Sequence, residues 1–278
     1  MLWLSICLDL SMGKIHSRQQ AGAIKAAPIK HSYTQRQFAE IFRCHCDPQY
    51  FIDNYLKFKN SAHGLTPFKF LTRPYQQAQL RIMQSNSVFC LQPRNSGSTA
   101  LPLAFQLWSA IFKPHTRHGA AFIANILAAN NLSLIRHWYD DLPQWLRPDL
   151  TYASNRLLEF DNGSSITSGL ICANFNQGRA WSTLYVDCLS LADKRDQENF
   201  WLSAATVLSG RVFLTGTPNS PTDTFAKIWN GLMKQPNSHF TTMQVPVGLV
   251  YSQSEQDNLR QLVGDRTFRR EYNCEFIP

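Results

Sequence analysis

The stretch Leu91-Gln92-Pro93-Arg94-Asn95-Ser96-Gly97-Ser98-Thr99-Ala100 lies between two regular patterns. The apolar run at residues 87–91 predicts a short buried strand, and the helical spacing of apolar residues at 99–112 predicts a helix. The stretch is therefore predicted to be a strand-to-helix turn. Such a turn is the usual setting of a phosphate-binding loop, because backbone N–H groups at the start of the helix point at the anion.

The loop fits the general phosphate-loop pattern G-x-x-x-x-G-K-S/T only in part. Gly97 and Thr99 match the second Gly and the hydroxyl that contacts magnesium. However, Ser98 stands in place of the Lys, and Gln92 stands in place of the first Gly. Considered alone, the stretch is better explained as an ordinary glycine turn.

The composition predicts a folded protein with an excess of positive charge. Apolar residues make up 44% of the 278 residues and aromatic residues 12%, which is enough to build a full core. Lys and Arg outnumber Asp and Glu by 27 to 19, and the net charge of +8 suits a polyanionic partner such as nucleic acid.

The cysteines and the apolar N-terminus indicate in which cellular compartment the protein is expected. The seven cysteines are an odd number and are scattered, which favours free thiols in a reducing compartment. The cluster Cys44-His45-Cys46 has no second pair at the spacing of a zinc site, so we expect no metal centre there. Residues 1–12 are too few to span a bilayer and lack the positive region of a signal peptide. We therefore expect a soluble, cytoplasmic protein.

Two regions are expected along the chain. Residues 1–47 are predicted to be a basic, partly flexible N-terminal arm, and residues 48–278 one domain. Residues 14–37 contain no acidic side chain. This segment either contacts DNA phosphates or a partner, or is a solvated tail. Helical patterns at 35–43, 48–58 and 75–83 predict a small helical lead-in to the domain.

The domain alternates predicted strands and helices. Strands are predicted at residues 87–91, 119–124, 156–160, 164–167, 183–186 and 212–215, and helices at 99–112, 128–146 and 200–208. Asp161-Asn162-Gly163 predicts a tight turn between the third and fourth of these strands. This order predicts an α/β fold with a mainly parallel sheet flanked by helices and functional residues at strand ends.

Two later strand ends carry side chains that suit a nucleotide site. Asp187 follows the strand at 183–186, and a carboxylate in this position can hold magnesium beside a phosphate loop. The segment 215–220 follows the next strand, and its hydroxyls and backbone turns are suited to sensing a γ-phosphate. Each segment alone is also explained as an ordinary strand end, but their order and spacing favour a common site.

With these motifs in order, the sequence resembles the ATPase domain of the large subunit of tailed-phage terminases. The resemblance covers residues 50–277, about four-fifths of the chain. The matching segments are residues 64–69, 74–76, 94–99, 158–166, 185–187 and 217–219. The resemblance implies a P-loop NTPase-like fold of the ASCE or RecA-like type, with ATP and Mg²⁺ as ligands. It also implies a homo-oligomeric ring that packages double-stranded DNA with a portal protein and a small terminase subunit, in the host cytoplasm.

The resemblance also implies roles for individual residues. Nucleotide contacts are assigned to Tyr75, Gln76, Arg94, Asn95, Ser96, Gly97, Ser98 and Thr99, with Tyr75 and Gln76 at the adenine. Magnesium is assigned to Thr99 and Asp187. Coupling of hydrolysis to DNA movement is assigned to Thr215, Thr217, Pro218 and Asn219.

Three positions depart from the family pattern. Ser98 replaces the phosphate-loop Lys, Cys188 replaces the carboxylate expected to activate water, and Gln177 replaces an Arg, although Arg179 follows closely. The nuclease domain of the family is expected to be absent from this chain. The departures predict weak nucleotide binding, with hydrolysis impaired or lost.

Two other functions remain open at this stage. The chain could be a non-enzymatic DNA-binding or assembly scaffold that keeps the fold. It could also be an active motor in which Arg94 replaces the Lys and a base comes from Glu159, Asp193 or a partner chain.

Overall fold

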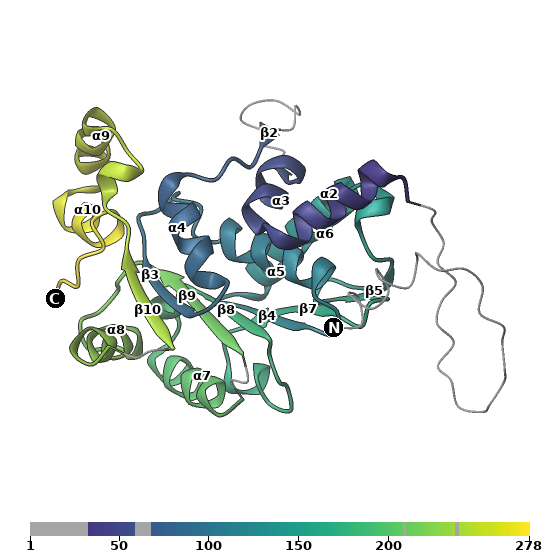
Figure 1. The fold of residues 1–278 in the computed structure, drawn as a ribbon. Helices are drawn as coiled ribbons and strands as arrows, with labels where there is room; N and C mark the ends of the chain where they lie inside the picture. The colour runs from purple at the N-terminus through teal and green to yellow at the C-terminus, as the bar shows by residue number, and fades with distance from the viewer. Residues whose placement is uncertain (1–32, 59–67, 208–209, 237–238) are drawn as a thin grey trace, which may run out of the picture. The chain divides into compact units, whose positions relative to one another are not determined.

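A sheet of eight strands in the order β10-β3-β9-β8-β4-β7-β6-β5 organises the structure (Figure 1). The computed structural model describes residues 33–58, 68–207, 210–236 and 239–278. Within it, Gln35–Pro278 forms one compact unit. Most of the predicted basic arm and the family-like segment at 64–67 lie outside the described residues.

The bounds of the elements are as follows. The strands are β1 Lys57–Phe58, β2 Phe68–Lys69, β3 Ser87–Leu91, β4 Arg117–Phe122, β5 Leu150–Ala153, β6 Leu157–Phe160, β7 Ser165–Leu170, β8 Thr183–Asp187, β9 Arg211–Gly216 and β10 Phe240–Gln244. The α-helices are α2 Gln35–Cys46, α3 Pro48–Tyr55, α4 Pro74–Met83, α5 Ala100–Phe112, α6 Asn125–Asp141, α7 Lys194–Val207, α8 Thr224–Lys234, α9 Gln253–Val263 and α10 Asp265–Glu271. Short 3-10 helices are η2 Gln144–Leu146, η3 Ala173–Phe175, η4 Leu189–Leu191 and η5 Val247–Leu249.

The sheet is parallel from β10 to β7 and ends in two antiparallel strands. The five residues of β3 are all buried, which explains why this strand is an uninterrupted apolar run. The predicted turn at Asp161-Asn162-Gly163 joins β6 to β7, and Gly163 has the positive φ of 80° that such a turn favours. The mainly parallel α/β sheet predicted from the sequence is therefore confirmed.

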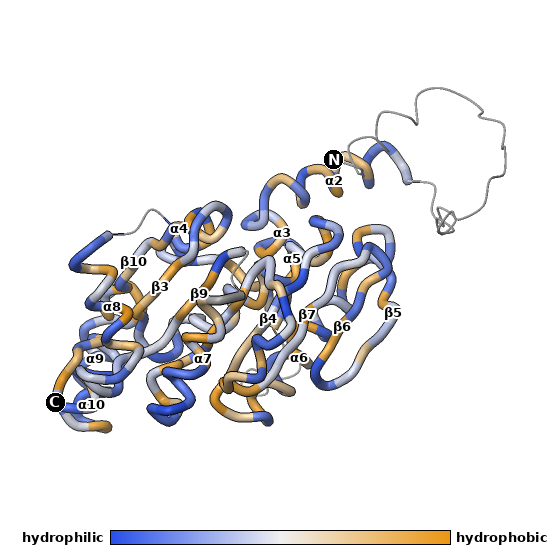
Figure 2. The backbone as a smooth tube through the Cα atoms, turned by 90° about the horizontal axis from the view of Figure 1, so that it is seen from below, coloured by the Kyte–Doolittle hydropathy of each residue, from blue (hydrophilic) through white to orange (hydrophobic). Residues whose placement is uncertain are grey.

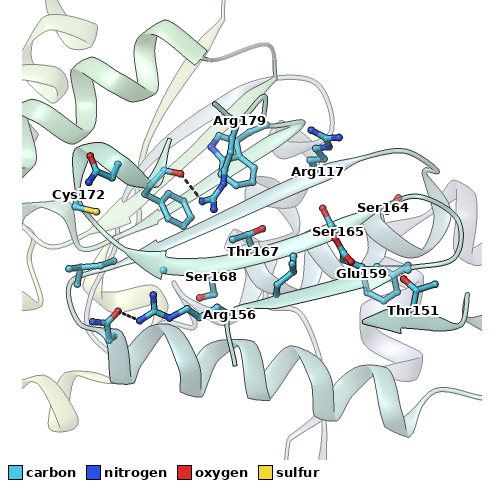
Figure 3. A pocket seen from close by; sticks show the side chains of 18 of the residues that line it. Arg117, Thr151, Arg156, Glu159, Ser164, Ser165, Thr167, Ser168, Cys172 and Arg179 are labelled. Atoms are coloured by element: carbon cyan, nitrogen blue, oxygen red, sulfur yellow. Dashed lines mark hydrogen bonds between the residues drawn. The ribbon is translucent and has the colours of Figure 1, made fainter. Parts of the chain in front are cut away.

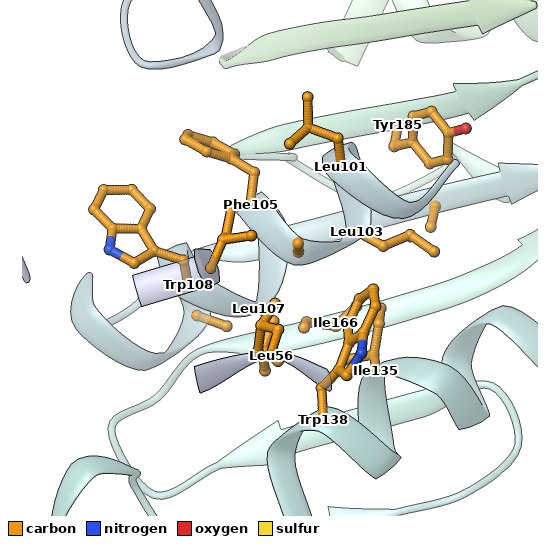
Figure 4. Close-up of a cluster of buried hydrophobic side chains, with 14 of the residues drawn as sticks. Leu56, Leu101, Leu103, Phe105, Leu107, Trp108, Ile135, Trp138, Ile166 and Tyr185 are labelled. Carbon is orange, nitrogen blue, oxygen red and sulfur yellow. The ribbon is translucent and has the colours of Figure 1, made fainter. Parts of the chain in front are cut away.

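Helices cover the two faces of the sheet unequally. Helices α4, α5 and α6 lie on one face, whereas α7 and α8 lie under the β10–β8 half of the other face (Figure 1). Apolar residues are concentrated along the central strands (Figure 2). The larger core includes Leu107 of α5, which lies near Ile135 and Trp138 of α6 (Figure 4). Phe105 of the same helix packs against Phe213 of β9, with ring centres 5.5 Å apart. A second core includes Phe89 of β3 and lies toward α7 and α8.

Several predicted boundaries were wrong. The strand predicted at 119–124 begins at Arg117, and the helix predicted at 128–146 ends at Asp141 before the 3-10 helix η2. The helix predicted at 48–58 ends at Tyr55, because Lys57 and Phe58 pair with β2 instead. The edge strands β5 and β10 and the helices α8, α9 and α10 were not predicted.

The cysteine side chains form no disulfide bonds among the described residues. The six cysteines in the described ranges are free, and no three His, Cys, Asp or Glu side chains in those ranges are placed to hold a metal ion. Among the described helices, none combines the length and the apolar character that crossing a bilayer requires.

Candidate functional site

A cavity of about 290 Å³ lies at the carboxyl ends of β3, β8 and β9. It is lined by loop residues 92–95 and 97–100, by Asp187 and Cys188 after β8, and by Gly216 and Thr217 after β9. The structure thus brings together the three segments that the sequence singled out. Parallel pairing explains this, because it places the carboxyl ends of neighbouring strands at one edge of the sheet.

The backbone of the loop makes a left-handed turn that leaves three N–H groups unpaired in the described structure. Asn95 and Gly97 have positive φ values of 59° and 81°, and the turn leads directly into α5. Within the described residues, the backbone N–H groups of Gly97, Ser98 and Thr99 donate no hydrogen bond. Unpaired N–H groups at a helix start that follows a left-handed turn form a concave anion site.

Tyr75 and Gln76 hold the loop from behind. The Tyr75 hydroxyl and the Gln76 Nε2 donate to the Ser96 carbonyl at 2.7 and 3.1 Å. Both side chains are buried, and neither lines the cavity. A Cβ on Gly97 would lie 2.4 Å from Gln76 Nε2, so this contact requires glycine. Tyr75 and Gln76 therefore position the loop in this structure.

Asp187 and Thr99 lie next to each other in the wall of the cavity. Thr99 Oγ1 is 3.4 Å from Asp187 Oδ1, and the Tyr185 hydroxyl donates to the same carboxylate oxygen at 2.7 Å. Carboxylate and hydroxyl oxygens are the ligand types that Mg²⁺ prefers, and ligands at about 2.0–2.1 Å from the ion lie about 3 Å apart. The two side chains therefore fit a magnesium ion that also contacts phosphate.

The segment after β9 is fixed by buried hydroxyls. Thr215 is fully buried, and its Oγ1 lies 3.0 Å from the Tyr185 hydroxyl, which also contacts Asp187. Ser190 Oγ donates to the Thr217 carbonyl at 2.7 Å, and Asn219 Nδ2 donates to the Ser190 carbonyl at 3.1 Å. Pro218 is buried between them. The segment 215–219 is therefore linked to the end of β8 by direct contacts.

Cys188 occupies the position expected for a water-activating carboxylate. It lines the cavity with φ of 53°, its backbone N–H donates to the Thr215 carbonyl at 2.9 Å, and its Sγ is 3.8 Å from Asp187 Oδ1. Burial and the neighbouring Asp187 carboxyl raise the pKa of the Cys188 thiol well above its ordinary value. The thiol is therefore protonated at neutral pH and is a poor base.

Arg94 is held by the C-terminal helices. Arg94 Nε donates to Glu271 Oε2 at 2.7 Å, and the Tyr251 hydroxyl donates to the Arg94 carbonyl at 2.8 Å. Glu271 is buried and also accepts from Thr217 Oγ1 at 2.8 Å. Glu271 was missed in the sequence, because it lies 177 residues from Arg94 within an ordinary charged helix.

Other candidate residues lie away from the cavity. Gln177 is exposed beside η3, Glu159 lies on β6, three strands from β8 in the sheet, and Asp193 precedes α7. None of them lines the cavity. The structure therefore provides no replacement for the missing base among these side chains.

Burial raises the pKa of the Asp187 carboxyl, and this predicts a pH dependence. Magnesium requires the ionised carboxylate, so Mg²⁺-dependent nucleotide affinity should fall as the pH is lowered through the raised pKa. Binding near that pH should release a proton, since the carboxyl is then partly protonated in the free protein. Titration calorimetry in two buffers of different ionisation enthalpy measures this proton. In Asp187→Asn the proton release and the Mg²⁺ dependence should both disappear, and their persistence would exclude Asp187 as the magnesium ligand.

Comparisons with known proteins show which solved structures have a similar fold. The sequence matches no protein-family model. The ATPase domain of the Thermus phage P74-26 large terminase is similar, with a TM-score of 0.56 and 14% identity over 74% of this chain and 95% of that chain. The large terminase of bacteriophage HK97 gives a TM-score of 0.61 and 12% identity over 83% of this chain and 54% of that chain.

A large terminase from a thermophilic bacteriophage, solved in complex with ADP, gives a TM-score of 0.59 and 12% identity over 74% of this chain and 53% of that chain. The chain thus spans about half the length of the HK97 protein and of this ADP-bound terminase. In contrast, the match to the isolated P74-26 ATPase domain covers 95% of that domain. This chain therefore has the fold of the phage large-terminase ATPase domains, which is of the P-loop NTPase type.

Proposed function

We propose that this chain is a terminase-type ATPase domain that binds ATP with Mg²⁺ weakly and hydrolyses it slowly or not at all. The observation that carries the proposal is that one cavity brings the glycine turn at Gly97 together with the adjacent Thr99 and Asp187 oxygens, while Cys188 stands where a base is expected. The thermophilic-phage large terminase has been solved with ADP and also with ATP-γ-S, which supports nucleotide binding in a protein of this fold.

The contacts support binding that is weak. The free N–H groups of Gly97, Ser98 and Thr99 supply donors for phosphate oxygens. The missing Lys removes one charge-assisted hydrogen bond, worth about 1.5–3 kcal/mol, or about ten- to a hundredfold in affinity. Arg94 supplies the only permanent positive charge among the described residues that line the cavity, and it is ion-paired with Glu271, which also pairs with Arg270. The cavity therefore offers less charge to the phosphates than the family pattern does.

The environment of Cys188 supports the loss of turnover. A general base contributes about 10²–10⁴-fold to a rate. The raised pKa of the thiol leaves it unable to accept a proton from water near neutral pH. Magnesium bound by Thr99 and Asp187 would still neutralise phosphate charge. In this proposal the site therefore still binds and positions ATP with magnesium, but it no longer removes a proton from the attacking water.

The biological setting is proposed from the fold and the charge. We place the chain in phage or prophage DNA packaging in the host cytoplasm, with double-stranded DNA as the polyanion. The portal protein, a small terminase subunit and other copies of the chain in a ring are its proposed partners. The similarity to large terminases and the net charge of +8 support this setting.

Steady-state phosphate release tests the proposal. Purified protein with ATP, Mg²⁺ and DNA should release phosphate far more slowly than ordinary enzymes, whose turnover numbers start at about 1 per second. Turnover above that rate would contradict the proposal.

A non-enzymatic scaffold is the second candidate function. The Arg94–Glu271 ion pair favours it, because the pair holds the loop in place without a nucleotide. A scaffold should bind DNA with an affinity that falls with salt and does not change with ATP. Nucleotide-dependent DNA binding would exclude this second function.

A further inference from the structure

A second, larger cavity of about 720 Å³ lies on the face of the sheet opposite α5 and α6 (Figure 3). On β7, Ile166 packs into the core below α5 and α6, and Ser168 Oγ donates to the Ala128 carbonyl of α6. Because side chains alternate along a strand, Ser165 and Thr167 point to the other face, where they line this cavity. We call it the sheet groove.

The sheet groove is open because the helices on that face stop short of it. Helices α7 and α8 lie below the β10–β8 half of the sheet, and no labelled helix lies below β7, β6 or β5 in the described residues (Figure 1). The strands here carry hydroxyl groups on the uncovered face. In the described part of the chain, this face of β7 and β6 is therefore left without a covering α-helix.

Three arginines from separate segments line the sheet groove. They are Arg117 at the start of β4, Arg156 before β6 and Arg179 after η3, and all three are exposed (Figure 3). In the described ranges none of them forms an ion pair, whereas Arg136 and Arg269 elsewhere pair with carboxylates at 2.8 and 2.7 Å. Of the described residues that line the groove, only Glu159 is acidic. The groove therefore has a net positive charge that these lining residues do not neutralise.

Two of the arginines are held in position by neutral groups. Arg156 Nη2 donates to Asn125 Oδ1 at 3.3 Å, and Arg179 Nη1 donates to the Phe175 carbonyl at 2.9 Å. The Arg179 guanidinium also lies 5.6 Å from the centres of the Phe175 and Trp181 rings. These contacts orient the guanidinium groups and leave their charge intact.

We propose that the sheet groove binds the phosphate backbone of double-stranded DNA. Arginine and Ser/Thr hydroxyl groups are the main donors to DNA phosphates, and a groove with no base-reading element predicts contacts without sequence preference. A second copy of the chain would carry the same charge of +8 and is a poor match. The inference rests on the proposed function for the identity of the polyanion.

Salt-dependent DNA binding of the full chain tests the inference. The triple variant Arg117→Gln, Arg156→Gln and Arg179→Gln should lower the slope of log affinity against log salt by about 3, since each phosphate contact contributes about 0.9. The probe is a short DNA duplex of mixed sequence followed by fluorescence anisotropy. The triple Arg→Lys variant keeps the charge and should keep most of the slope. Glu159→Gln should increase affinity.

A matched control removes three charges from the opposite side of the sheet. The variant Lys57→Gln, Lys69→Gln and Arg81→Gln removes three exposed charges and should change the slope by less than about 1. An unchanged slope in the groove variant, or an equal loss in the control, would overturn the inference. So would unchanged DNA binding combined with altered self-association in sedimentation, since the groove would then be an interface between copies.

A measurement of nucleotide binding tests the proposed function independently of DNA binding by the sheet groove. A fluorescent ATP analogue should bind the groove variants and the unmodified chain equally, which also shows that the variants are folded. Loss of DNA binding with retained nucleotide binding supports the groove. Absence of nucleotide binding in the unmodified chain would contradict the proposed function and leave the DNA result standing.

Discussion

The double variant Ser98→Lys, Cys188→Glu is expected to hydrolyse ATP at least about a hundredfold faster than the unmodified chain. Glu at position 188 restores a general base beside the proposed magnesium ligand Asp187, a change worth about 10²–10⁴ in rate. Lys at position 98 restores a charge-assisted bond to the phosphates and should tighten nucleotide binding about ten- to a hundredfold. Steady-state phosphate release and analogue titration measure the two effects separately.

The matched control for this variant is Ser98→Lys, Cys188→Gln. Gln has nearly the size of Glu but cannot accept a proton from water, so this control should gain affinity without gaining turnover. The left-handed backbone at Cys188, with φ of 53°, is already adopted by a side chain with a Cβ, so both replacements face the same backbone conformation. Equal turnover in the two variants would show that position 188 does not act as the base.

Glu271→Gln is expected to increase affinity for an ATP analogue about tenfold, the gain of one hydrogen bond to a charged group. Glu271 holds the Arg94 guanidinium at 2.7 Å, and phosphate oxygens must compete with this carboxylate for the only permanent positive charge among the described residues of the cavity wall. Removing the carboxylate charge makes that guanidinium available, and such a bond is worth about 1.5–3 kcal/mol. The amide oxygen of Gln can still accept from Thr217 Oγ1, whereas the ion pair of Glu271 with Arg270 at 2.9 Å is lost together with that to Arg94.

A double-mutant cycle separates this effect from a general loosening of the loop. In Arg94→Ala, Glu271→Gln the gain should disappear, because the guanidinium is no longer present to bind phosphate. A gain of the same size with and without Arg94 would show that Glu271 acts through the loop backbone. A loss of affinity in Glu271→Gln alone would contradict the proposed competition.

The strand, loop and helix from residue 87 to residue 112 could be predicted from sequence because their signals are local. The same holds for Asp187 and for the segment after β9, since each follows a buried apolar strand. Once the strands are known to pair in parallel, the carboxyl ends of β3, β8 and β9 must lie at the same edge of the sheet. The convergence of loop residues, Asp187, Cys188 and Thr217 on one cavity follows from that topology.

The features that were missed depend on contacts between distant segments or on weak patterns. Strands β5 and β10 lie at the two edges of the sheet, where β5 is mostly exposed and β10 is half-buried, so neither shows the apolar run of a buried strand. Glu271 acquires its role only when α10 packs beside the loop. The arginines of the sheet groove come from three segments, which are brought together by the pairing of β4, β7 and β6 and by the loop that follows η3.

Titration with a fluorescent ATP analogue, with and without Mg²⁺, tests the central claim most directly. The unmodified chain should bind the analogue, and Mg²⁺ should tighten binding, because Thr99 and Asp187 provide adjacent oxygen ligands 3.4 Å apart. Thr99→Ala should weaken the Mg²⁺ effect. Absence of binding under both conditions, or an Mg²⁺ effect of full size in Thr99→Ala, would contradict the assignment of this cavity as a nucleotide site.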